Sequence, residues 1–204
     1  MNKHYAWAVA VGLVLAAILV ATATAGSGDR TAKQVAALKH QVAQLKAYSP
    51  AGIAKELART KAALDKYQSV AVAKAAGYVA SSPCAFSLAG AGEESSHPGG
   101  MGIHYTNDAL LKGPLTPSKP PVLVYAPTAD GGLQLVAAEY FKPDADQNVK
   151  TDGDRPTLFG RQFDGPMLGH APGMPIHYDL HVWLWKHNPS GIFAPWNPDV
   201  SCTS

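Results

Sequence analysis

Cysteine is scarce in this chain, with only Cys84 and Cys202 among 204 residues. One pair without a C-x-x-C spacing allows a single intramolecular disulfide and argues against a thiol-based metal or redox motif. Disulfides form in oxidising compartments, and closing a loop this long would stabilise the fold by roughly 4–5 kcal/mol on the chain-entropy model. The sequence therefore predicts a structural Cys84–Cys202 disulfide.

The chain also lacks an excess of charge of either sign. Its 17 Lys and Arg residues nearly balance 15 Asp and Glu residues, for a formal net charge of +2, and Lys and Arg form no block. Nucleic-acid-binding domains carry a basic patch or stripe. We therefore expect no nucleic-acid partner.

Several catalytic motifs are missing as well. The sequence contains no G-x-S-x-G, no H-E-x-x-H and no Gly-rich phosphate loop ahead of a helix. These absences argue against a nucleophilic serine of that class, against the zinc proteases that use H-E-x-x-H, and against nucleotide binding. The remaining patterns leave open whether the chain is an enzyme.

Charged residues are absent from residues 6–25, which are rich in Ala, Val and Leu and end in Ala23-Thr24-Ala25. This pattern predicts a secretory signal peptide over residues 1–25. An uncleaved membrane anchor is the alternative, because about 20 apolar residues suffice to span a bilayer. Both interpretations place the rest of the chain outside the cytoplasm, either secreted, periplasmic or anchored to the outer face of the membrane. We expect membrane contact only through this segment.

Residues 29–76 predict a helical stalk or packing helices. An a/d-like stripe at spacings of three, four and three is formed by Val35, Leu38, Val42 and Leu45. This stripe predicts weak homo-oligomerisation through the helix at residues 30–48. Ser49-Pro50 is typical of a helix start, and a second helix should run to about residue 76, with Gly77 as its C-cap.

The composition changes at residues 77–204, where Gly and Pro are frequent and apolar runs are short. The stretch "VLVYAPTADGGLQLVAAEYF" predicts a hairpin with strands at 122–126 and 133–141. "TLFGRQF" predicts a short strand, and residues 176–186 form the longest β-like run. We expect an α+β fold, in which N-terminal helices precede a compact antiparallel β-rich domain closed by the disulfide.

Histidines concentrate in the stretch "IHYDLHVWLWKH". Strand alternation assigns one face to His177, Asp179, His181, Trp183 and Trp185. The opposite face, predicted to be core, receives Tyr178, Leu180, Val182 and Leu184. His177 and His181 would share a side in a helix too, so their proximity does not depend on the type of element.

Two further residues could join these histidines. Glu139 is predicted to share a strand face with Leu133, Leu135, Ala137 and Phe141. A carboxylate among apolar neighbours is costly to bury unless it is paired or bound to a metal, although an edge strand would let its head reach solvent. The stretch "HPGGMGIHYTN" contains a glycine run that permits close backbone approach. His104 follows this run at the start of an extended segment.

These residues predict a site for a divalent transition metal with His104, Glu139 and His181 as ligands, and His177 as a fourth ligand or a neighbour of the ligands. Two histidines and a carboxylate suit non-haem iron, three histidines with an open position suit zinc, and a thioether from Met101 would favour copper. The alternative is a metal-free binding or structural module of the cell envelope, with the histidines packed in its core.

Four stretches, "MGIHY", "VLVYAP…GGLQLVAAEYF", "LFGRQF" and "LHVWLWKHNPSGIFAPWNPDVSC", resemble a widespread set of uncharacterised bacterial secreted proteins. The resemblance covers roughly residues 67–202 and omits the N-terminal helices. It implies an extracytoplasmic domain and draws attention to His104, Glu139 and His181, but it implies no activity or substrate.

Overall fold

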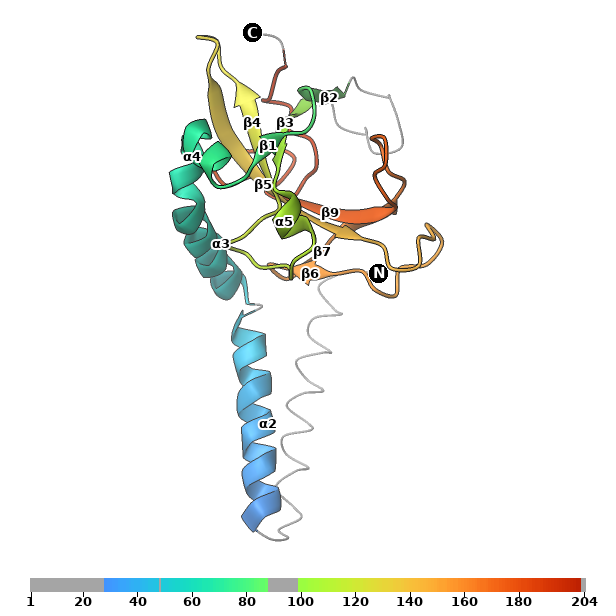
Figure 1. Ribbon diagram of the computed structural model, residues 1–204. Helices are drawn as coiled ribbons and strands as arrows, with labels where there is room; N and C mark the ends of the chain where they lie inside the picture. Colours follow the sequence, from blue (N-terminus) through green and yellow to red (C-terminus); the bar gives the residue numbers. More distant parts are fainter. Residues whose placement is uncertain (1–27, 48, 88–98, 203–204) are drawn as a thin grey trace. The chain divides into compact units, whose positions relative to one another are not determined.

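A computed structural model describes residues 28–47, 49–87 and 99–202 (Figure 1). The predicted signal peptide or anchor at residues 1–25 lies outside them. None of the described helices combines the length and the apolar character needed to cross a bilayer. The chain divides into two compact units, residues 1–49 and residues 50–204.

The first unit contains one described helix, α2 (Gly28–Ala47). Its sequence consists largely of Ala, Lys, Gln and Leu, which favour helix, so the predicted helix is confirmed. Val35 and Val42 of the apolar stripe are 44% and 43% exposed. The homo-oligomer through this stripe stays a prediction.

The second unit begins with three short helical segments, α3 (Pro50–Leu64), the 3-10 turn η1 (Asp65–Gln68) and α4 (Val70–Ala75). The expectation of one helix to residue 76 is therefore wrong. Ser69 has extended backbone angles, and its side chain accepts a hydrogen bond from the Val72 N–H, which caps a new helix. Gly77 follows with a φ of +93°, so the predicted helix end is confirmed.

An antiparallel sheet of seven strands forms the body of this unit, which confirms the α+β fold. The strands run in the order β1-β3-β4-β5-β9-β8, and β2 also pairs with β3. Their bounds are β1 (Val79–Ala80), β2 (Ala85–Ser87), β3 (Gly99–Thr106), β4 (Val122–Pro127), β5 (Leu133–Pro143), β8 (Asp164–Met167) and β9 (His177–Val182). A helical turn, α5 (Asp108–Leu111), and a small hairpin of β6 (Thr157–Leu158) and β7 (Arg161–Gln162) lie in the connections.

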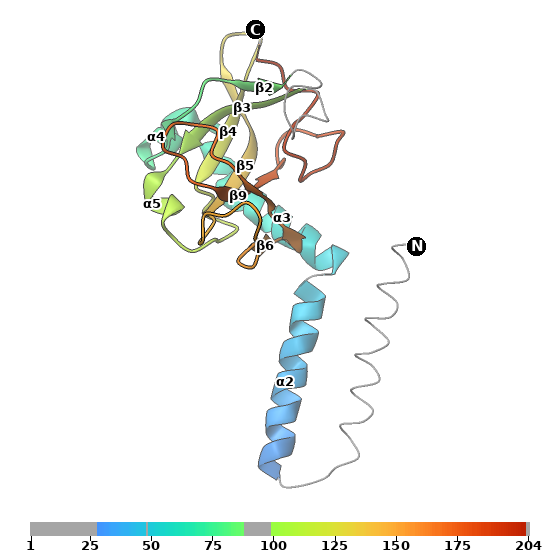
Figure 2. The same ribbon diagram turned by 90° about the vertical axis from the view of Figure 1, so that its right-hand side faces the viewer.

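The helices α3 and α4 cover one face of the sheet (Figures 1 and 2). Leu64 packs there with Tyr140, Tyr178 and Leu180, as predicted for the core face of β9. The other face packs a second cluster in which Trp183 and Val200 of the C-terminal region lie against β4 and β5. Both faces of the central strands are therefore covered.

Strand alternation fails at two predicted positions. Val124 pairs with Ala137 but Tyr125 pairs with Leu135, so Val136 is an extra residue in β5. Such a bulge shifts the alternation, and Leu135 packs on the helix side with Tyr125, whereas Ala137 packs on the opposite side. The expectation that Leu133 and Leu135 share the face of Glu139 is wrong.

Trp185 also departs from its predicted face. Strand β9 ends at Val182, so alternation no longer governs the residues that follow. The Trp185 side chain packs on the helix side, and its Nε1–H donates a hydrogen bond of 2.6 Å to Asp65 Oδ1. This contact ties the end of the strand region to η1.

The Cys84–Cys202 disulfide is present, with the two Cα atoms 5.6 Å apart, as predicted. The C-terminal segment lies against the start of β3, where Gly100 and Asn197 form an isolated β-bridge. A Cβ at Gly99 would lie 2.2 Å from the Asn197 carbonyl oxygen, so the glycine permits this approach.

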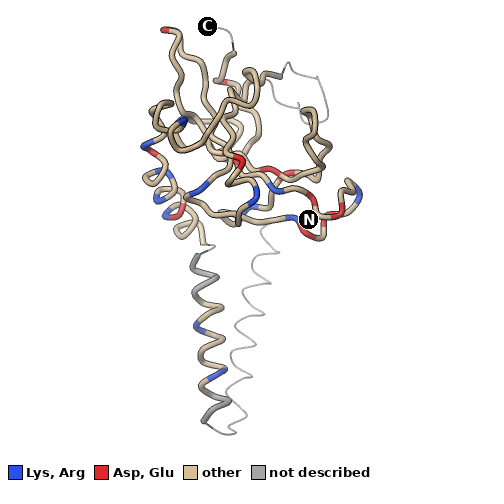
Figure 3. Tube along the Cα trace, viewed as in Figure 1, with Lys and Arg blue, Asp and Glu red and all other residues tan. Residues whose placement is uncertain are grey.

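Charge is sparse on the strands that build the sheet. The sequences of β3 and β4 contain no Asp, Glu, Lys or Arg, and Figure 3 shows both traces in tan, whereas charged positions occur along the helices and loops. Glu139 on β5 and Asp179 on β9 are buried exceptions. Buried carboxylates of this kind require compensating partners.

Candidate metal centre

Strands β3, β5 and β9 of the sheet place His104, Glu139 and His181 on one face, with β4 between β3 and β5. Glu139 of β5 stands directly opposite His181 of β9. His104 of β3 pairs with Val124 of β4, while Val122 of β4 pairs with Glu139, so His104 and Glu139 are diagonal neighbours across β4. The pairing register thus brings together three residues from distant parts of the sequence.

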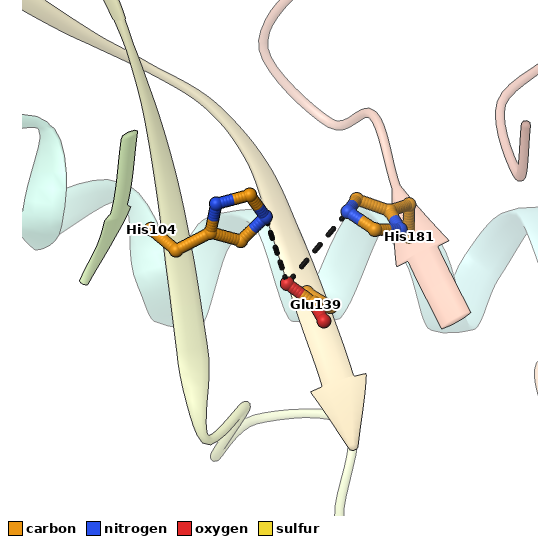
Figure 4. Close-up of side chains that lie close together, drawn as sticks. All are labelled: His104, Glu139 and His181. Atoms are coloured by element: carbon orange, nitrogen blue, oxygen red, sulfur yellow. Dashed lines mark ion pairs between the residues drawn. The ribbon is translucent and has the colours of Figure 1, made fainter. Parts of the chain in front are cut away.

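The side chains converge on Oε2 of Glu139 (Figure 4). Nε2 of His104 lies 3.2 Å from this oxygen, and Nε2 of His181 lies 3.7 Å from it. One potential ligand atom from each of the three residues lies within 4.8 Å of the other two. The imidazole rings are nearly perpendicular, at 85°, with centroids 6.0 Å apart.

Glycine at position 102 allows β3 to pass close to β4 just before His104. Gly102 has a φ of +114°, and a Cβ there would lie 2.6 Å from the Tyr125 carbonyl oxygen. A larger residue would push the strands apart, and His104 would then move away from Glu139. The sequence-based interpretation of the glycine run as a site of close approach is confirmed.

The site is buried. The side chain of His181 is 1% exposed, that of Glu139 10% and that of His104 16%. Because β5 lies between β4 and β9, Glu139 is in the interior of the sheet, and the alternative of an edge residue in solvent is wrong. His104 is the most exposed of the three side chains.

Burial disfavours the charged form of all three residues. It raises the pKa of Glu139 to about 8. Burial, with a smaller effect of His170, lowers the pKa of His104 to about 4. Burial, followed by the effects of His104 and His170, lowers the pKa of His181 to about 3. At neutral pH the metal-free cluster therefore holds two neutral imidazoles and a protonated carboxyl group.

Hydrogen bonding within the described part of the chain leaves several atoms of the cluster unsatisfied. Oε2 of Glu139 and both ring nitrogens of His181 are buried without a hydrogen-bond partner there. A neutral imidazole always carries one N–H, and an unmet buried donor or acceptor costs about 1–3 kcal/mol. The donor atoms are thus available to a ligand at the point where they converge.

His177 is on the same strand as His181 but outside the cluster. Its ring stacks on Phe141, with centroids 4.7 Å apart, and its Nδ1 lies 3.0 Å from the Pro175 carbonyl oxygen. Its Nε2 approaches Asp179 Oδ2 at 4.0 Å, and burial lowers its pKa. The structure brings together His104, Glu139 and His181, and His177 packs further along β9. A role for His177 as a ligand or a neighbour of the ligands stays a prediction.

Sequence reasoning missed two residues near the site. Ser82 Oγ lies 3.0 Å from Nδ1 of His104, and exposed His170 has its ring centroid 5.2 Å from that of His177. Ser82 precedes His104 by 22 residues, a separation that no motif encodes. His170 belongs to the connection between β8 and β9, and loop conformation is poorly specified by periodicity.

Comparison of the chain with protein-family models, with curated proteins and with solved structures finds no match. The resemblance to bacterial secreted proteins stays a prediction.

Proposed function

We propose that this protein is an extracytoplasmic domain that binds one divalent transition-metal ion through Nε2 of His104, Oε2 of Glu139 and Nε2 of His181. The observation that carries the proposal is the convergence of one ligand atom from each of these residues within 4.8 Å in the interior of the sheet. Imidazole nitrogen and carboxylate oxygen are suitable ligands for zinc, iron and copper.

The spacing of the donor atoms is compatible with a tetrahedral zinc ion. Zinc bonds to His and Glu are about 2.0–2.1 Å long, so the ligand atoms of a tetrahedral site are separated by roughly 3.3–3.4 Å. The separations of Oε2 from the two Nε2 atoms, 3.2 Å and 3.7 Å, bracket this value. Only small side-chain movements would be needed to reach bonding geometry.

The electrostatics support the same conclusion. Nε2 of His104 and Oε2 of Glu139 approach within 3.2 Å, yet Oε2 has no hydrogen-bond partner within the described ranges. A cation between them would meet the carboxylate charge and both imidazole lone pairs at once. Because buried carboxylates are stabilised by metal coordination, the ion would also offset the cost of burying ionised Glu139.

Three protein ligands leave one position of a tetrahedral ion open, as in catalytic zinc sites. Such an ion supplies Lewis acidity when bound. Within this chain, His104, Glu139 and His181 would hold it. The disulfide supports the extracytoplasmic location, because such bonds persist in oxidising compartments.

Metal retention tests the proposal. The purified chain is loaded with Zn²⁺, dialysed and analysed for elemental zinc, and we expect close to one ion per chain. The double variant His104→Ala, His181→Ala should lose it, whereas His187→Ala, at an exposed position just before a turn, should retain it. An empty wild-type protein, or full retention by a folded double variant, would contradict the proposal and favour a metal-free envelope module.

A further inference from the structure

The segment between β1 and β2 lies along one edge of β3 and places Ser82 beside Nδ1 of the His104 ring. Strands β1 and β2 both pair with β3, on either side of this segment. Ser82 Oγ makes three contacts there, at 3.0 Å to His104 Nδ1, 3.1 Å to the His104 main-chain N and 2.8 Å to the Pro83 carbonyl oxygen. The backbone pairing therefore holds a single hydroxyl group against the histidine.

The number of protons on this hydroxyl determines the direction of each hydrogen bond. A serine hydroxyl has one proton to donate and two lone pairs to accept with. The Pro83 carbonyl only accepts, so it takes the hydroxyl proton, and the His104 main-chain N–H donates to the first lone pair. The second lone pair then accepts from His104 Nδ1, which must carry a proton.

A neutral imidazole with its proton on Nδ1 has its free lone pair on Nε2. Nε2 is the His104 atom that faces Glu139 Oε2 at 3.2 Å. We propose that Ser82 is a positioning residue that fixes His104 in the Nδ1–H tautomer and directs the Nε2 lone pair into the cluster. Its effect on metal affinity rests on the proposed function, but the tautomer itself does not.

The adjacent serine provides a matched control. Ser81 Oγ contacts Thr106 Oγ1 at 2.6 Å and the His104 carbonyl oxygen at 3.2 Å. It therefore belongs to the same segment and contacts the same residue, but through the main chain instead of the ring. Replacing Ser81 removes a hydroxyl from the segment but leaves the hydrogen bond between Ser82 and the imidazole in place.

The first measurement is the tautomer of His104 in the metal-free wild-type protein, by imidazole nitrogen NMR. We expect protonated Nδ1 and unprotonated Nε2, with a mixture of tautomers in Ser82→Ala and the wild-type pattern in Ser81→Ala. Protonated Nε2 in the wild type, or an unchanged pattern in Ser82→Ala, would overturn the inference. The wild-type spectrum gives a result even if Ser82→Ala fails to fold.

The second measurement is Zn²⁺ affinity by competition with a chromophoric chelator. Loss of a group that orients a metal-binding histidine reduces affinity about 10–100-fold, so we expect this loss in Ser82→Ala, recovery in Ser82→Thr and no change in Ser81→Ala. Equal affinity of folded Ser82→Ala and wild type would overturn the positioning role. A wild type that binds no Zn²⁺ would instead contradict the proposed function, while the NMR result would still decide the tautomer.

Discussion

Zinc binding at pH 6 should release about one proton, and that proton should come from Glu139. In the metal-free protein the pKa of Glu139 is about 8, so at pH 6 its carboxyl group is almost fully protonated. His104 and His181, with pKa values of about 4 and 3, are neutral at this pH. Because ligands must be deprotonated to bind a metal, one proton leaves the carboxyl group and none leaves the imidazoles.

Ordinary pKa values would give a different number. With His at 6.5 and Glu at 4.5, the two imidazoles would be about three-quarters protonated at pH 6 and the carboxyl group would be ionised. Binding would then release about 1.5 protons, all from histidine. The buried cluster and a solvent-like cluster therefore differ both in the number of protons and in their source.

Calorimetric titration of Zn²⁺ in buffers of different ionisation enthalpy measures this number directly. The expected slope is about one proton for the wild type and near zero for Glu139→Gln. A pH of 6 keeps the contribution of zinc-bound water small, because its pKa is about 7 in comparable sites. About 1.5 protons in both proteins would refute the assignment of the proton to Glu139.

Three further predictions follow from the same structure. Apparent Zn²⁺ affinity should rise about tenfold per pH unit from pH 5 to 7 and level off above pH 8, the pKa of Glu139, when measured by chelator competition. Burial raises the pKa of Glu139 from 4.5 to about 8, so the free energy of unfolding of the metal-free protein, measured by chemical denaturation, should fall between pH 4.5 and 8 relative to that of Glu139→Gln. An equal pH dependence of the two proteins would contradict burial of the Glu139 carboxyl group. Reduction of Cys84–Cys202 should lower the free energy of unfolding by roughly 4–5 kcal/mol, and unreduced protein should show no thiols available for alkylation.

Local patterns were sufficient to predict β4, β5 and β9 of the sheet, but not β1, β2 or β8. Alternating residues on β9 correctly assigned Tyr178, Leu180 and Val182 to the core, and the Gly131-Gly132 turn predicted the β4–β5 hairpin. The bulge at Val136 was not predictable, because its flanking residues are all apolar and suit either face. Sequence periodicity indicates which positions are buried, so it cannot locate a bulge residue in a strand whose two faces are both buried.

Only part of the site was predicted from the sequence, and the reason is physical. Glu139 was identified because a carboxylate on an apolar strand needs a partner, and His181 because alternation placed it on one strand face with His177. The register then places Glu139 and His181 opposite each other. His177 met the same criterion, yet it stacks on Phe141 instead. Ser82 gave no signal, since its position depends on how β1 and β2 both pair with β3.

The central claim is that His104, Glu139 and His181 hold one metal ion. Anomalous diffraction from crystals of the zinc-loaded chain, recorded on both sides of the zinc absorption edge, tests this most directly. We expect one strong peak about 2.0–2.1 Å from Nε2 of His104, Oε2 of Glu139 and Nε2 of His181. A loaded crystal with no peak at this position, or with its zinc bound elsewhere, would contradict the account.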